Sequence, residues 1–192
     1  MLKRSTSEIR PEKFICGSDN QPLVVYHGTN QSFKEFDEAF LCSVGFHFGC
    51  REQAEFRARL GPRRIIKAHL VKGRALLDIR EKQDPGWEQP ALTCMILADF
   101  GVFSLEEAHA LDFPMSTHAS ATASESERRV YNSRIGKLLR AKGWDSVAYS
   151  NDNEPNDGAR RDAYAVFSAD QIHILGFEDE NEFSVKHTHS SK

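Results

Sequence analysis

The chain has 192 residues, of which 40% are hydrophobic and 28% charged, and a formal net charge of −3. This length fits one domain with short extensions, and this composition is typical of a globular protein whose core needs neither disulfides nor a structural metal. The slight excess of acidic residues does not favour nonspecific nucleic-acid binding, which leaves only a local basic groove open.

The cysteines and the first residues indicate a reducing compartment. The four cysteines form no CxxC pair and have no metal-ligand spacing with histidine, which is typical of free thiols. Residues 1–14 lack the apolar stretch of a secretory signal, and no run approaches the roughly 20 apolar residues that cross a bilayer. We therefore expect a soluble, cytoplasmic protein without membrane association.

In chain order, the first half predicts a polar, loosely held lead-in, two short strands, a helix and two further strands. These elements cover residues 1–21, 22–27, 43–49, 51–60, 64–71 and 75–79. The first strand is expected to stop at Gly28, and the helix to direct Ala54 and Phe56 towards the core. The short connection 72–74 (KGR) indicates a hairpin between the last two strands.

The second half predicts three helices, a loop of small polar residues before the third, and then three strands. These elements cover residues 91–100, a helix from 104, a loop over 114–124, a helix over 124–142, and strands over 145–150, 163–168 and 171–177. Ser104 with Glu107, and Ser124 with Glu127, have the spacing of capping boxes. Gly143 is expected to end the third helix.

Strands at both ends with helices between them predict an α+β domain over residues 22–177, followed by a disordered tail over 178–192. The connections are too irregular for a doubly wound parallel sheet, and no GxGxxG motif follows a strand.

The stretch 26–29 (YHGT) is the first candidate site. A histidine that leaves a strand beside a bare glycine can offer its imidazole and close main-chain hydrogen bonds to a ligand. A histidine held by backbone at a strand end is the alternative. The stretch 45–49 (GFHFG) suits a flat slot in which a planar ring stacks, or an edge strand whose aromatic residues fill the core.

A third candidate site follows the strand at 145–150. The stretch 151–154 (NDNE) places a carboxylate and two amides there, ahead of a loop too long for a tight hairpin. A solvated acidic loop is the alternative. Asp162 competes with Glu154 for any carboxylate role. The closing strands, with a turn over 168–170, are interpreted as scaffold.

In this order, the four segments resemble the ADP-ribosyltransferase superfamily, in its diphtheria-toxin and poly(ADP-ribose) polymerase branch, and most of all the small forms in phage polyvalent proteins and bacterial toxins. The matching positions are residues 26–29, 45–49 with Ala54, 143–147 through Asn151 and Glu154, and 164–167 through Gln171 and Ile172. The resemblance spans residues 22–177. It implies split mixed and antiparallel sheets around an NAD-binding cleft, with helices inserted between the strands.

The resemblance also implies roles for the first two segments. His27 would hydrogen-bond the adenosine ribose, and the backbone of Gly28, followed by Thr29, would hold the nicotinamide carboxamide. His47, followed by Phe48, stands where this branch usually has a tyrosine that stacks on nicotinamide. Phe56 lies near the position of a second stacking aromatic in relatives.

Glu154 resembles the catalytic glutamate of the small relatives, in an N-x-x-E form that begins at Asn151. In the polymerases this glutamate directly precedes the tyrosine of the last motif, where this chain has Ala163, so Asp162 is the fallback. A carboxylate there would stabilise the positive charge that builds on the ribose as its bond to nicotinamide breaks. The resemblance thus implies NAD⁺ as co-substrate and no metal.

The leading hypothesis is an ADP-ribosyltransferase that acts on a protein or nucleic acid. An NAD⁺ glycohydrolase with the same residues, and a non-catalytic module that keeps the fold, are the alternatives. A third hypothesis is a metal site at His187 and His189, for which the alternative is that both histidines lie in a solvated tail. The resemblance further implies a toxin or phage-conflict effector with an antitoxin or inhibitor as partner.

Overall fold

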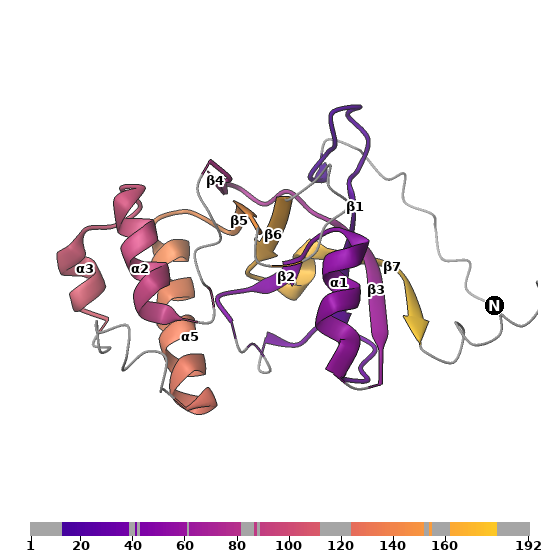
Figure 1. Ribbon diagram of the computed structural model, residues 1–192. Helices are drawn as coiled ribbons and strands as arrows, with labels where there is room; N and C mark the ends of the chain where they lie inside the picture. Colours follow the sequence, from indigo (N-terminus) through magenta and orange to yellow (C-terminus); the bar gives the residue numbers. More distant parts are fainter. Residues whose placement is uncertain are drawn as a thin grey trace, which may run out of the picture.

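The computed structural model describes residues 13–38, 41, 43–60, 62–81, 87, 89–111, 124–151, 154 and 162–179. In these residues the chain forms two small sheets side by side (Figure 1). The first has the order β1-β3-β7 and is antiparallel, with bounds Val24–Thr29, Arg64–Leu70 and Ile172–Asp179. The second has the order β2-β6-β5-β4, with bounds Phe46–Phe48, Asp162–Val166, Ser146–Ser150 and Leu76–Ile79. The predicted α+β class with split sheets is confirmed.

Helices cover the two sheets separately. α1 (Arg51–Arg57) continues into a 3₁₀ turn and packs on β1, while α2 (Pro90–Asp99), α3 (Leu105–His109) and α5 (Glu125–Ala141) form a layer beside the second sheet (Figure 1). The two predicted capping boxes start α3 and α5. Gly143 follows α5 with a φ of +92°, a conformation that glycine adopts without strain.

The predicted hairpin between the strands at 64–71 and 75–79 is wrong, because β3 and β4 belong to different sheets. Both edges of β3 are occupied, by β1 and β7, and β4 instead pairs in parallel with β5. The Asp145 carboxylate accepts hydrogen bonds from the backbone amides of Arg74 and Ala75. A Cβ at Gly73 would lie 2.2 Å from that carboxylate, so an added side chain here would displace the Asp145 carboxylate from these amides.

The closing strands also divide between the sheets, since β6 joins the second and β7 the first. Ser168 starts a 3₁₀ turn over Ala169–Gln171 that redirects the chain. β1 extends two residues further than predicted, to Thr29, because Gly28 and Thr29 keep their pairing with β3. Part of the lead-in is packed, because Phe14 and Ile15 are buried and Phe14 bridges to Val71, whereas residues 18–21 are exposed.

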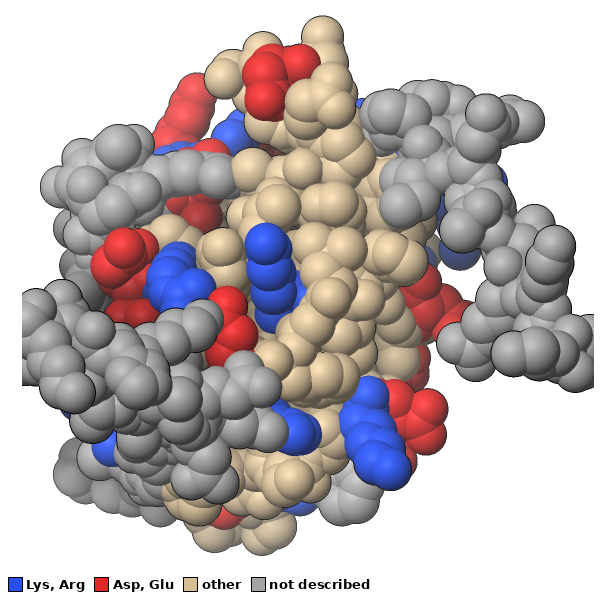
Figure 2. Space-filling model, turned by 90° about the vertical axis from the view of Figure 1, so that its right-hand side faces the viewer, with Lys and Arg blue, Asp and Glu red and all other residues tan. Residues whose placement is uncertain are grey.

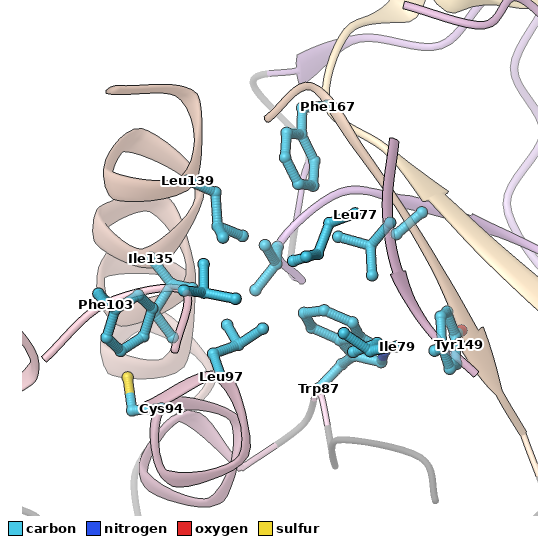
Figure 3. Packing of buried hydrophobic residues seen from close by; sticks show 14 of the residues in the cluster. Leu77, Ile79, Trp87, Cys94, Leu97, Phe103, Ile135, Leu139, Tyr149 and Phe167 are labelled. Carbon is cyan, nitrogen blue, oxygen red and sulfur yellow. The ribbon is translucent and has the colours of Figure 1, made fainter. Parts of the chain in front are cut away.

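Two main apolar clusters hold these layers together. One fills the space between the second sheet and the helices, with Leu77, Ile79, Leu97, Ile135, Leu139 and Phe167 among its members (Figure 3). The other joins the two sheets, through Val25, Phe36, Phe48, Ile66, Leu70, Tyr164 and Val166. Because this second cluster bridges the sheets, it fixes the ends of β1, β2 and β5 relative to one another.

No helix in the described ranges is long and apolar enough to cross a membrane. On the face shown in Figure 2, basic and acidic side chains are interspersed among uncharged surface rather than gathered into a basic groove. Arg51 of α1, for example, pairs with Glu55 and with Glu178 of β7. The loop over 114–123, the tail beyond 179, and His187 and His189 lie outside the described residues.

Candidate active site

A cavity of about 420 Å³ lies where β1 approaches β2, α1 and the end of β5. This volume is within the range of small-molecule sites. Six of the residues singled out in the sequence line it, from three separate segments: His27, Gly28, His47, Phe48, Asn151 and Glu154.

The backbone of Gly28 is turned into this cavity. Tyr26 exchanges both of its backbone hydrogen bonds with Gly49, at 2.9 and 3.0 Å, so its N–H and C=O point away from β3. In an extended strand the residue two positions on points the same way, and β1 pairs with β3 in continuous register through Gly28. The Gly28 N–H and C=O therefore face the cavity just beyond the bridge.

The helix α1 packs directly on this glycine. A Cβ at Gly28 would lie 1.7 Å from the backbone oxygen of Ala54, closer than any real contact. This approach brings Gln53, Ala54 and Arg57 of α1 to the cavity wall. Gly28 is thus required both by the packing and by the open backbone edge.

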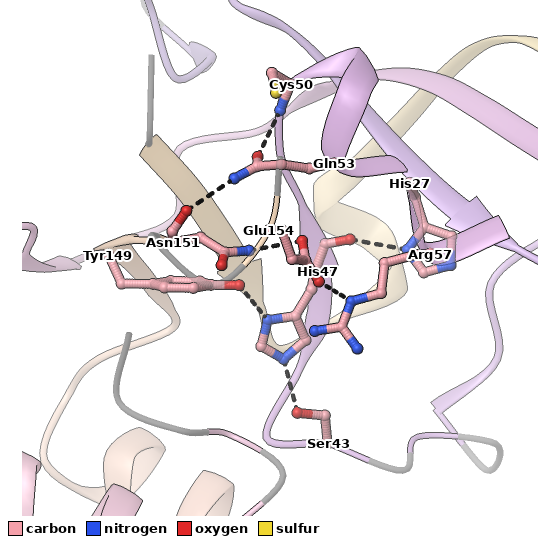
Figure 4. Close-up of polar contacts among 9 residues, drawn as sticks. All are labelled: His27, Ser43, His47, Cys50, Gln53, Arg57, Tyr149, Asn151 and Glu154. Atoms are coloured by element: carbon pink, nitrogen blue, oxygen red, sulfur yellow. Dashed lines mark hydrogen bonds and ion pairs between the residues drawn. The ribbon is translucent and has the colours of Figure 1, made fainter. Parts of the chain in front are cut away.

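His27 is held in one tautomer by the neighbouring strand. Its Nδ1 lies 2.8 Å from the backbone oxygen of His47, and since a carbonyl only accepts, Nδ1 carries the hydrogen (Figure 4). Burial lowers the pKa of His27, with the Arg57 charge adding to the effect. The ring is therefore neutral near pH 7, and its Nε2 is a hydrogen-bond acceptor.

Both ring nitrogens of His47 are hydrogen-bonded. Nδ1 lies 2.8 Å from the hydroxyl of Tyr149 and Nε2 lies 2.7 Å from that of Ser43 (Figure 4). Burial, with the charge of Arg57, lowers the pKa of His47 to about 3. A neutral imidazole has one donor and one acceptor, and a hydroxyl serves either. The two bonds hold the ring by its edges, so that only its faces are left for packing.

The depressed pKa of His47 predicts that acid destabilises the fold. Below its ordinary value of 6.5 the unfolded chain takes up a proton that the folded ring refuses until about pH 3, so stability falls as the pH falls through this window. At about 1.4 kcal/mol per pH unit, the protonation equilibrium of His47 lowers the free energy of unfolding by ~2 kcal/mol between pH 6.5 and 5. Urea unfolding at both pH values measures it.

The matched variant His47→Gln lacks the titrating group and should reduce this pH dependence by a similar amount, leaving the contribution of His27, which has the same sign. An unchanged dependence in the variant would show that His47 is not a buried neutral ring.

Glu154 is the buried carboxylate of the cavity. One of its oxygens accepts a 2.7 Å hydrogen bond from Asn151 Nδ2, and the other pairs with Nε of Arg57 (Figure 4). Gln53 supports this arrangement, because its Nε2 donates to the backbone oxygen of Asn151 at 3.3 Å and its Oε1 accepts from the amide of Cys50 at 2.9 Å. Gln53 thereby fixes the start of the segment that carries Glu154.

A polar atom beside Glu154 has no hydrogen-bond partner within the described residues. Asn151 is 4% exposed, and its Oδ1 is buried without a donor. An unsatisfied buried acceptor costs about 1–3 kcal/mol. The residue therefore suits a ligand that brings a hydroxyl or an amide.

Three residues considered in the sequence do not line the cavity. Thr29 accepts a hydrogen bond from the Gln31 amide, and Asp162 pairs with Arg80 at the surface, at 2.9 Å. Phe56 lies on another face of α1, where the guanidinium of Arg59 covers its ring. The expected orientation of Phe56 towards the core is wrong, because the helix directs Ala54 inward and leaves Phe56 half-buried.

The structure adds aromatic and polar residues that the sequence did not single out. Trp87 and Tyr149 stand beside His47, with ring centroids 5.6 and 5.8 Å from it. Trp87 follows no periodic pattern that could have revealed it. Tyr149 lies within a predicted strand, and nothing in the pattern of that strand distinguishes it as a site residue. Gln53 could have been found from the sequence, since it stands three residues after Cys50, the N-cap of α1, which is the spacing of a capping box.

A family model described as ADP-ribosyltransferase in polyvalent proteins matches residues 18–178. A solved structure described as an anti-CRISPR protein is 15% identical, with 82% of this chain and 94% of that chain covered, and a TM-score of 0.35. So low a TM-score carries no argument about fold or function. No curated protein matches the chain.

Proposed function

The chain belongs to the family of ADP-ribosyltransferases in polyvalent proteins, and on this basis we propose that it transfers ADP-ribose from NAD⁺ to a protein or nucleic acid. The observation that carries the proposal is a buried carboxylate, Glu154, that shares one cavity with the open backbone edge of Gly28. A dinucleotide with a carboxamide at one end needs both.

Each part of the cavity matches one part of NAD⁺. The Gly28 N–H and C=O form a donor–acceptor pair, which is what a carboxamide requires. The Nε2 of His27 accepts from a ribose hydroxyl. The rings of His47, Trp87 and Tyr149 form a wall that excludes water from the planar base.

The reaction exchanges one glycosidic bond for another. The bond between the ribose C1′ and the nicotinamide nitrogen breaks, and its electron pair stays with nicotinamide, which leaves neutral. A nucleophilic atom of the acceptor bonds to C1′ and loses its proton. The carboxylate of Glu154 stabilises the positive charge that builds on the ribose, and this interaction is stronger in the transition state than in the ground state.

An NAD⁺ glycohydrolase would use the same residues with water as the acceptor, and a non-catalytic module would bind without turnover. Incubation with NAD⁺ labelled in its adenine separates the three, with lysate present or absent. The proposal predicts label on macromolecules, with nicotinamide release increased by lysate. If nicotinamide release is the same with and without lysate and free ADP-ribose is the sole labelled product, the protein is a glycohydrolase. If no nicotinamide is released, the protein is a non-catalytic module. Dependence on lysate would also fit the expected effector role.

A further inference from the structure

Among the described residues, one cation shares the cavity with the buried carboxylate. Arg57 lies at the end of α1, its Nε pairs with Glu154, and it lines the cavity. We propose that Arg57 binds the diphosphate of the dinucleotide, and that it does so by leaving Glu154. This inference rests on the proposed function. The ligand would thus exchange one ion pair for another and uncover the carboxylate.

The charges of the cavity support this exchange. Among the lining residues that the structure describes, Arg57 is the only lysine or arginine, and the two histidines are neutral because burial lowers the pKa of each. A dinucleotide diphosphate carries two negative charges. Close to Glu154 the diphosphate would be repelled unless a cation neutralised its charge, and a guanidinium pairs well with phosphate oxygens.

The two partners differ in their freedom to move. The side chain of Arg57 is 51% exposed, whereas that of Glu154 is 6% exposed. Glu154 also keeps its hydrogen bond from Asn151 when Arg57 leaves. The arginine is therefore the member of the pair that can swing towards solvent and ligand, and the carboxylate stays in place with one oxygen freed for the ribose.

The exchange predicts a thermodynamic coupling that a purely structural ion pair would not give. Arg57→Gln should weaken the binding of ADP-ribose at least 10-fold and leave that of adenosine, which has no phosphate, within 2-fold. Glu154→Gln should tighten ADP-ribose binding several-fold, because Arg57 no longer has to leave a carboxylate, and should have no such effect once Arg57 is glutamine.

This coupling is measured by calorimetric titration of ADP-ribose and of adenosine. The proteins compared are the wild type, the two single variants Arg57→Gln and Glu154→Gln, and the double variant. Arg59→Gln is the matched control, since Arg59 stacks on Phe56 away from the cavity, and it should leave ADP-ribose affinity unchanged. Equal ADP-ribose affinity of the wild type and Arg57→Gln would overturn the inference, as would no ADP-ribose binding at all.

Nicotinamide release by the wild type, recorded in parallel, separates this inference from the proposed function. If nicotinamide is released but ADP-ribose binds equally well without Arg57, only the proposed exchange is contradicted. If ADP-ribose binding depends on Arg57 but no nicotinamide is released, only the proposed transferase activity is contradicted.

Discussion

Replacing Glu154 by glutamine should lower the rate of nicotinamide release from NAD⁺ by about 100-fold or more. Glutamine keeps the shape of the side chain and removes the charge that faces the ribose in the transition state. Loss of one such electrostatic group typically costs 10²–10³ in rate. Because the interaction develops mainly in the transition state, the loss should appear in kcat, with NAD⁺ affinity changed far less.

The matched control is Asp162→Asn, which removes the other carboxylate that the sequence offered. Asp162 pairs with Arg80 at the surface and lies outside the cavity lining, so release should stay within about 2-fold of the wild type. The reverse result, with Asp162→Asn inactive and Glu154→Gln active, would assign the carboxylate role to Asp162. Thermal unfolding of both variants checks that each is folded.

Gly28→Ala should destabilise the fold by about 3 kcal/mol or more and abolish NAD⁺ binding. The added Cβ would meet the backbone oxygen of Ala54 at 1.7 Å and its carbonyl carbon at 2.5 Å, and no side-chain rotation relieves a contact with backbone. Helix α1 must move, and it carries Gln53 and Arg57 of the cavity wall. Urea unfolding and NAD⁺ titration measure the two effects.

The control for this steric effect is Gly176→Ala in β7, where an added Cβ meets nothing within 4 Å. That variant should unfold like the wild type and bind NAD⁺ normally. If Gly28→Ala behaved the same way, the close approach of α1 to β1 would not exist in solution, and the proposed cavity would lose one wall.

Local sequence patterns were sufficient for most elements of this fold but not for their pairing. The capping boxes at Ser104 and Ser124 predicted two helix starts, because capping depends on residues three positions apart. The hairpin predicted at 72–74 failed because the partner of that turn, Asp145, lies far along the chain. A strand pattern says which residues are extended and not which strand edge is vacant.

The candidate site shows the same division. His27, Gly28 and Glu154 were singled out because each is a polar or glycine residue at the end of an apolar strand, and strand ends meet at the cavity. Phe56 was misplaced because a stacking role was carried over from relatives without regard to its helical phase. Trp87 contacts the site only through tertiary packing, and nothing near it in the sequence indicates that contact.

The proposed function requires above all that this cavity binds NAD⁺ and breaks its bond to nicotinamide. The most direct test is to incubate the purified protein with NAD⁺, with and without lysate, and measure bound NAD⁺ and free nicotinamide on the same samples. We expect the wild type to bind NAD⁺ and to release nicotinamide, and we expect this release to be lost in Glu154→Gln. Absence of both binding and release under every condition would contradict the proposed function, and would leave a transferase fold reused as an interaction module.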